Sequence, residues 1–338
     1  MSDMRKRIVR LKGAFVTEAA SVVGKHESEG PLRDAFDRCD RTDTFGADTW
    51  EKAESEMQKK AFELLLKKAD VYPAELDALF AGDLQNQCVG SSYGLLGTGV
   101  PYFGLYGACS TAAEGLILSA MAVDSGHYRR CVAVTSSHYL AAERQYRSPT
   151  EYGAQRSPTA QWTVTGAGAF LVSGEGNVRI SEVMPGVVVE KGINDASNMG
   201  AAMAPAVVDT LCAYFDESGL TPKDFDAIVT GDLGFEGGEI LCEMMAAHGR
   251  DIRETYNDCG VLIYDRIRQD KHSGGSGCGC SAAVMAAHYL RLLRVGRIKN
   301  MLFIGTGAMM SPSSIQQGLA IPAVAHLLKL EYEQRESY

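Results

Sequence analysis

The sequence predicts an α/β protein made of two duplicated βαβ-type halves, with sheets that are mainly parallel or mixed. Two observations carry this prediction. Short apolar runs alternate with amphipathic helices, which is the pattern of strands covered by helices on both faces. A turn, a short helical start and a buried strand ending in Gly-Asp also occur twice, at residues 69–84 and 215–233.

The two copies agree in order and spacing. Asp77 and Asp83 of the first block match Asp226 and Asp232 of the second at a constant offset of 149 residues. A second pair of blocks, each a helix followed by a glycine and an apolar strand, is offset by 170 residues, from Gly126 to Gly296. Ordered agreement in both pairs indicates a duplication, with halves at residues 1–175 and 176–338.

The elements can be assigned in chain order. The opening region, through residues 33–48, is polar and is expected to form loops and edge structure. Residues 50–69 form an amphipathic helix, because their apolar positions recur at helical spacing. Buried strands are expected to end at Asp83, near Ser136, at Asp232 and near Thr306, and a C-terminal helix is expected over residues 320–331.

Composition excludes several classes of protein. The formal charge of −9 argues against nucleic acid as a partner and against unaided binding to anionic lipid. No apolar run is long enough to span a membrane, and the basic start leads into no signal peptide. The nine cysteines lack metal-knuckle spacing and are expected to be reduced, mostly buried thiols. With no dinucleotide, Walker A or EF-hand motif, we expect no cofactor and no dedicated metal site.

The most informative motif is the small-residue turn Gly-Ala-Cys-Ser at residues 107–110, which places Cys109 at the start of a helix. The positive end of the helix dipole favours a thiolate there, and backbone N–H groups can bind an anion or oxyanion. A small buried Cys at a helix crossing is the alternative interpretation from the residues alone.

This turn resembles the nucleophile elbow of thiolases and ketoacyl synthases. Residues 165–169, Thr-Gly-Ala-Gly-Ala, are similar to the Asp-Gly-Ala-Gly-Ala strand of that family, and residues 305–308 resemble its closing Gly-rich turn. The resemblance covers nearly the whole chain. It implies a thiolase-like fold with αβαβα layering.

Within that family, the segments at residues 107–116, 137–147, 158–169 and 272–281 are most similar to a branch that serves spore formation. The resemblance implies a soluble, cytoplasmic-type protein that binds dipicolinic acid (pyridine-2,6-dicarboxylate), with calcium carried by the ligand, during dipicolinate uptake into the developing spore. It also implies peripheral association with the spore inner membrane, membrane-embedded partners from the same sporulation operon, and a homodimer.

Whether the chain is an enzyme depends on the partners of Cys109, since thiol acylation needs a base and oxyanion donors. Catalytic relatives have a His directly after the strand that here ends at Gly231, where this sequence has Asp232. His272 fits the His of the family's later Gly-rich loop. We therefore favour a non-catalytic binding protein and keep an acyltransferase, with Cys109 as nucleophile and His272 as base, as the alternative.

A third hypothesis is an assembly protein that docks on membrane-embedded partners through its acidic surface or through residues 320–331. The polar segment at residues 143–165 either covers the ligand site or forms a contact between lobes or subunits. His138 and His272 can equally be ordinary loop residues. The candidate ligand-binding residues are Asp83, Cys109, Ser110, Ser136, His138, Arg144, Arg147, Trp162, Thr163, Thr165, Asp232, His272 and Ser276.

Overall fold

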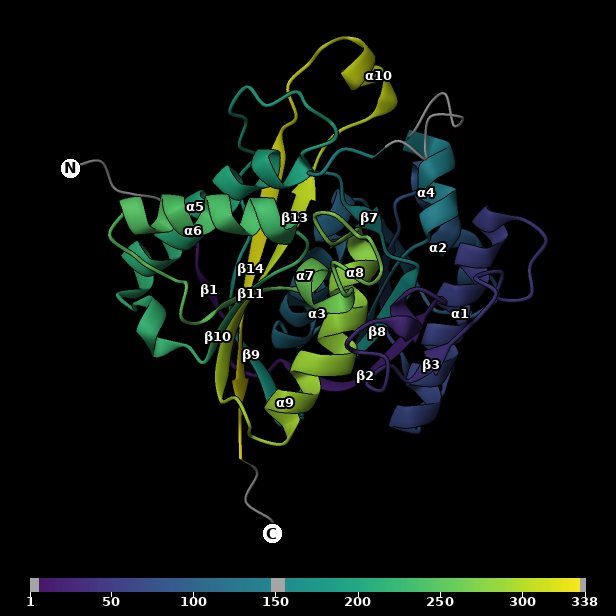
Figure 1. The fold of residues 1–338 in the computed structure, drawn as a ribbon. Helices are drawn as coiled ribbons and strands as arrows, with labels where there is room; N and C mark the ends of the chain where they lie inside the picture. The colour runs from purple at the N-terminus through teal and green to yellow at the C-terminus, as the bar shows by residue number, and fades with distance from the viewer. Residues whose placement is uncertain (1–5, 147–155, 335–338) are drawn as a thin grey trace.

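The computed structural model describes residues 6–146 and 156–334, which form one large mixed sheet with helices on both faces (Figure 1). The strands are β1 (Val9–Arg10), β2 (Phe15–Val23), β3 (Arg38–Cys39), β4 (Ala78–Gly82), β5 (Tyr102–Leu105), β6 (Arg130–Ser137), β7 (Trp162–Thr163), β8 (Gly166–Ser173), β9 (Val178–Met184), β10 (Ala227–Thr230), β11 (Tyr256–Asp258), β12 (Gly275–Ser276), β13 (Asn300–Ala308) and β14 (Ala323–Tyr332). The helices are α1 (Trp50–Ala69), α2 (Val89–Gly94), α3 (Thr111–Asp124), α4 (Tyr139–Tyr146), α5 (Met199–Ser218), α6 (Gly234–Ala247), α7 (Cys259–Ile263), α8 (Cys278–Val284), α9 (Leu290–Arg294) and α10 (Pro312–Gln316).

The order of the strands shows the duplication directly. Along the sheet they run β11-β10-β13-β14-β9-β2-β8-β6-β4-β5. From either outer edge, two parallel pairs are followed by two antiparallel pairs. The halves meet where β2 pairs with β9 at Phe15 and Arg179. The prediction of two duplicated halves is confirmed, and the boundary that we propose after residue 175 lies in the connection between β8 and β9.

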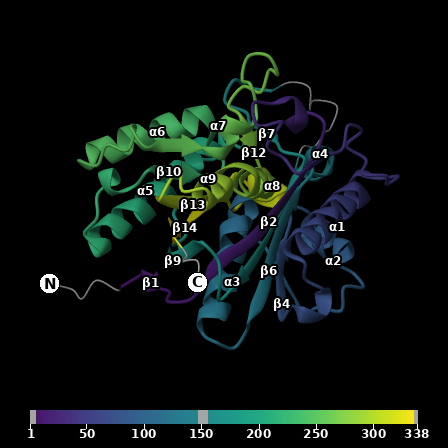
Figure 2. The same ribbon diagram turned by 90° about the horizontal axis from the view of Figure 1, so that it is seen from below.

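The elements form five layers, as the view from below shows most clearly (Figure 2). Helix α1 packs on β2, β6 and β8, while α5 packs on β13 and β14 at the opposite side. Helices α3 and α8 lie between the halves, and α3 contacts strands of both. Three hydrophobic cores separate these layers, with Leu116 in the central core and Leu65 and Leu211 in the two outer cores. This is the αβαβα arrangement that the family resemblance implied.

Several elements match their prediction closely. Helix α1 spans Trp50–Ala69, as its apolar periodicity indicated, and Thr49 caps it by accepting a hydrogen bond from the Lys52 amide. The strands expected before Asp83, Asp232, Ser136 and Thr306 are β4, β10, β6 and β13. All nine cysteines are free thiols, and seven of them are buried.

Three expectations were wrong. The C-terminal helix expected over residues 320–331 is strand β14, which is buried between β13 and β9. A strand buried on both faces shows no period-2 alternation, so its run of leucines looked helical. The opening region forms loops and the short strand β3 after residue 23, as expected, but its residues 15–23 form β2, a central strand. Residues 305–308 lie within β13 rather than in a turn.

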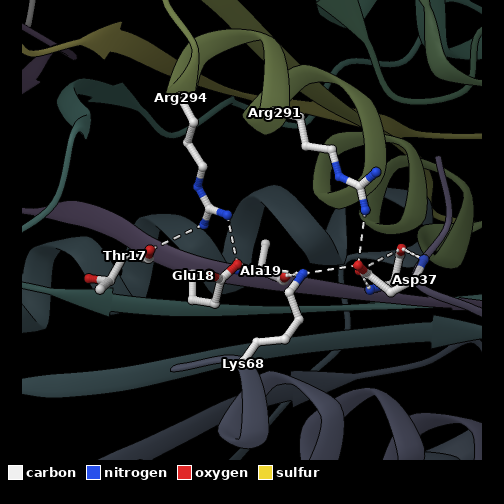
Figure 3. Close-up of polar contacts among 8 residues, drawn as sticks. Thr17, Glu18, Ala19, Asp37, Lys68, Arg291 and Arg294 are labelled. Atoms are coloured by element: carbon white, nitrogen blue, oxygen red, sulfur yellow. Dashed lines mark hydrogen bonds and ion pairs between the residues drawn. The ribbon is translucent and has the colours of Figure 1, made fainter. Parts of the chain in front are cut away.

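A half-buried ion-pair network ties three of these elements together at one end of the central layer (Figure 3). Arg294 of α9 bonds to Glu18 of β2 at 2.6 Å, while Arg291 of α9 and Lys68 of α1 both bond to the carboxylate of Asp37, at 2.9 and 3.0 Å. The other oxygen of Asp37 accepts hydrogen bonds from the amide and hydroxyl of Ser21. Asp37 is therefore the centre of this network.

Candidate functional site

A cavity of about 240 Å³ lies at the seam between the two halves, at the carboxyl ends of their strands. Cys109 is part of its lining, together with residues of α4 and of the segments before α5 and α10. The described lining residues are Leu84, Tyr106, Ala108, Cys109, Ala142, Glu143, Tyr146, Gln161, Thr163, Ala196, Ser197, Met199, Ser276, Ala308 and Met310. Most of them are apolar, and none of them is basic.

The turn that carries Cys109 is strained and tightly bonded. Ala108 has φ of 51°, in the left-handed region that non-glycine residues seldom adopt. The carbonyl of Gly107 accepts hydrogen bonds from the amide and hydroxyl of Ser110, at 3.1 and 2.6 Å. A Cβ on Gly307 would lie 2.3 Å from the Gly107 carbonyl oxygen, so glycine is required where β13 passes the turn. This fixes Cys109 directly before α3, as the sequence predicted.

Asp232 is fully buried directly behind Cys109. One of its carboxyl oxygens accepts a hydrogen bond from the Thr306 hydroxyl at 2.7 Å, and the other accepts one from the Gly277 amide at 2.8 Å. The Cys109 thiol lies beside this carboxyl, and each of the two groups affects the pKa of the other. Within the described residues Asp232 forms no ion pair, and burial raises its pKa to about 7 in spite of these donors.

The environment of Cys109 opposes thiolate formation. Burial raises the pKa of the thiol well above its ordinary value, and the neighbouring charge of Asp232 adds to this effect. Burial and the neighbouring carboxyl both favour the protonated thiol and oppose the effect of the helix start, which the sequence argument took to favour a thiolate.

His272 does not reach Cys109. Its Nδ1 is 2.6 Å from the Ser157 carbonyl oxygen, and its Nε2 is 3.3 Å from a carboxyl oxygen of Asp270. It is absent from the described cavity lining. The structure thus places next to Cys109 a carboxyl group and not an imidazole base.

The other candidates divide into two groups. Thr163 and Ser276 line the cavity, where β7 and β12 pair. The remaining candidates lie away from its wall and have other partners. Ser110 bonds to Gly107, Ser136 to Glu54, Asp83 to Ser91, His138 to the Asp43 carbonyl, Thr165 to the Tyr139 amide and Arg144 to Glu51. Arg147 lies outside the described residues.

Trp162 is not among the described residues that line the cavity. Its ring stacks on Tyr139 at 3.8 Å between centroids, and the ammonium of the buried Lys271 lies 3.2 Å from its centroid. Both contacts hold the segment that presents Thr163. Trp162 therefore supports the wall of the cavity and does not form the flat contact surface that we expected for an aromatic ligand.

The sequence argument missed several lining residues. Tyr106 and Tyr146 bridge the wall through their hydroxyls at 2.9 Å, and Tyr146 also donates to the Leu84 carbonyl at 2.7 Å. Gln161 is 4% exposed; its amide nitrogen donates to the carbonyls of Asp232 and Gly275, while its buried Oε1 has no hydrogen-bond partner among the described residues. The position of Tyr106 near Cys109 was the only signal for it. Met199 and Met310 carried none.

The chain has a thiolase-like fold, and a buried carboxyl group lies beside the cysteine that precedes α3. Three of the solved structures that share the fold illustrate this. They are 3-oxoacyl-[acyl-carrier-protein] synthase III from Aquifex aeolicus (TM-score 0.58, 13% identity, 95% of this chain and 100% of that one), an OleA variant from Xanthomonas campestris with cerulenin (0.61, 13%, 96% and 98%) and the priming β-ketosynthase of the R1128 polyketide pathway (0.55, 18%, 96% and 98%).

The chain belongs to the stage V sporulation protein AD family. The model of that family matches residues 5–331. A relative with that name from Bacillus subtilis (strain 168) is 39% identical over 313 residues, which are 92% of each chain. The resemblance that the sequence motifs indicated is thereby confirmed. Among the described residues, no helix is long and apolar enough to cross a membrane.

Proposed function

We propose that the chain binds dipicolinate in the cavity beside Cys109, as part of dipicolinate uptake into the developing spore, and that it transfers no acyl group. The observation that carries this proposal is the pairing of the Cys109 thiol with the buried carboxyl of Asp232. An ionised carboxylate would repel both a thiolate and a thioester oxyanion, so it supports a binding role over a catalytic one.

The size and lining of the cavity support a small ligand that has apolar surface and polar edges. Its volume of about 240 Å³ is below the roughly 300–1,000 Å³ of pockets for drug-sized ligands. Tyr106, Tyr146 and Met310 offer apolar surface, while Thr163 and Ser276 supply hydroxyls.

The charge of the lining favours the calcium chelate of dipicolinate as the ligand. A bare dianion would enter a site with no basic residue in its described lining and with the buried carboxyl of Asp232 close by, which is unfavourable without a counter-charge. The chelate is neutral overall. Its calcium ion prefers oxygen ligands, and the buried Oε1 of Gln161, which has no hydrogen-bond partner among the described residues, is of that kind.

Calorimetric titration with calcium dipicolinate tests the binding role. Cys109→Ala and Thr163→Val each alter the wall and should weaken binding about three- to tenfold, because each loses one polar contact or one packed side chain. Arg144→Ala is the control, since Arg144 pairs with Glu51 and does not line the cavity; its affinity should match that of the unchanged protein. Equal affinities for all four proteins would mean that calcium dipicolinate does not bind in this cavity.

Acyl transfer remains the second candidate function, because Cys109 keeps the strained turn before α3. Incubation with acetyl-CoA followed by intact-mass measurement distinguishes the two. The binding proposal predicts no mass gain. An acetyl adduct that disappears in Cys109→Ala, combined with no heat from dipicolinate, would establish the acyltransferase.

We also propose that the chain acts at the spore inner membrane beside membrane-embedded proteins of the same operon; the family resemblance supports this. Co-purification from spore membranes tests the association. If Cys109→Ala abolished dipicolinate loading but left co-purification intact, docking alone would not account for the role.

A further inference from the structure

An ionised Asp232 would repel an anion bound in the cavity. The charge of Asp232 therefore has to change when an anionic ligand binds. Its carboxyl is fully buried and is held by two uncharged donors, the Thr306 hydroxyl and the Gly277 amide. It adjoins the cavity, because the Cys109 thiol lies beside it and the cavity-lining Gln161 bonds to the Asp232 backbone carbonyl. Within the described residues it has no cation as a partner. An ionised Asp232 would therefore place an uncompensated negative charge one side chain away from an anionic ligand.

We propose that binding of the free dipicolinate dianion is coupled to the uptake of one proton by Asp232, whereas the calcium chelate binds without proton uptake. This inference rests on the proposed function and concerns the regulation of the same site. It makes the proton and the calcium ion alternative ways of removing the same electrostatic cost.

The position of the Cys109 thiol beside Asp232 suggests how protonation acts on the ligand. An ionised Asp232 attracts the thiol proton inward, toward the carboxylate. With Asp232 protonated, the carboxylic acid becomes a donor, and the thiol of Cys109 can turn its proton toward a ligand oxygen in the cavity. Protonation of Asp232 thus removes the negative charge next to the cavity and leaves the Cys109 thiol free to donate a hydrogen bond to the ligand.

The surroundings contain no competing basic group among the described residues that act on Asp232. The titratable groups that face it are carboxyl and thiol groups, namely Asp258 and the thiols of Cys109, Cys259, Cys278 and Cys280. Burial raises the pKa of each of these thiols well above the ordinary value, so they stay neutral. Asp258 is buried and satisfied by Thr230 and three backbone amides. Burial raises the pKa of Asp258 as well as that of Asp232, which reaches about 7. Asp232 is the one of the two that adjoins the cavity, through its bond to Gln161 and its position beside Cys109.

Calorimetry in two buffers of different ionisation enthalpy, HEPES and Tris, measures the proton directly. At about pH 8, free dipicolinate should bind the unchanged protein with uptake of close to one proton, and its affinity should fall toward tenfold for each further pH unit. At about pH 5.5, where Asp232 is already protonated, uptake should be near zero. Calcium dipicolinate should show near-zero uptake at both pH values.

Two variants test whether Asp232 is the residue that takes up the proton. Asp232→Asn should abolish the uptake at about pH 8 and make dipicolinate affinity independent of pH. Glu143→Gln, which removes the carboxylate on the cavity wall, is the matched control and should retain the uptake.

Binding of dipicolinate to the unchanged protein with no buffer dependence at about pH 8 would overturn this inference and leave the proposed function standing. If Glu143→Gln abolished the proton uptake, Glu143 and not Asp232 would be the residue that takes up the proton. That result would also overturn the inference. Absence of any binding, with or without calcium, would overturn the proposed function itself.

Discussion

At the scale of single residues, the most consequential substitution relative to catalytic relatives is Asp232. The sequence located it correctly at the end of a strand and at the position where the family resemblance places a His. What the sequence could not give was its burial, which raises its pKa, or the direction of His272, which turns to Ser157. Both depend on how distant segments pack around the seam.

Asp232→Asn should change how stability depends on pH. The carboxyl has an ordinary pKa of 3.8 when unfolded and about 7 when folded, so between these values the folded state binds a proton that the unfolded state lacks. Stability from this group is therefore fully present below about pH 4 and is lost as pH rises through 7. Asn cannot ionise, so the variant should gain on the unchanged protein by up to about 4 kcal/mol over this window.

Chemical denaturation at several pH values measures this difference. Comparing the two proteins at each pH cancels the contribution of the histidines and of the other buried carboxyls. A stability difference that stays constant from about pH 4 to pH 8 would contradict the burial argument.

At the scale of elements, helices with one exposed face were predictable and fully buried strands were not. Helix α1 has the polar face that makes periodicity visible, whereas β14 is covered on both sides and its leucines carry no period. Likewise β2 carries Thr17 and Glu18, polar residues that looked like loop; in the fold Glu18 is held by Arg294. Such segments form strands because they pair with strands that lie far away in the sequence.

The network at Asp37 joins α1, β2 and α9, and Asp37→Ala should lower the free energy of unfolding by about 2 kcal/mol, because Lys68, Arg291 and the Ser21 amide lose a shared, half-buried acceptor (Figure 3). Urea denaturation provides the measurement. Asp34→Ala is the control, since its pair with Arg33 is exposed and should contribute almost nothing. Equal losses in both variants would remove any special role from the network.

At the scale of the whole molecule, the duplication was readable because equivalent strands keep their end residues. The same symmetry also misled the site prediction. Asp83 and Asp232 end equivalent strands, yet Asp83 bonds to Ser91 in its own half while Asp232 reaches the cysteine at the seam. Only one half supplies the nucleophile-type turn, so the repeat predicts positions and not roles.

The free edge of the sheet suggests how two copies associate. No charged residue occurs between Asp83 and Glu114, and on this stretch Leu96, Tyr93 and Phe103 are 76%, 69% and 46% exposed. Strand β5 is the last strand at its end of the sheet, so a second copy can pair with it edge to edge. We expect a homodimer in sedimentation experiments, and Phe103→Asp should shift it to monomer. A monomer for both proteins would contradict this expectation.

The central claim is that the cavity beside Cys109 is a binding site for dipicolinate, and a crystal structure of the protein soaked with calcium dipicolinate tests it most directly. We predict ligand density in the cavity, with the calcium ion, located by its anomalous signal, close to Oε1 of Gln161 and with Cys109 unmodified. An empty cavity at saturating ligand, or density for an acyl group on Cys109, would contradict the account.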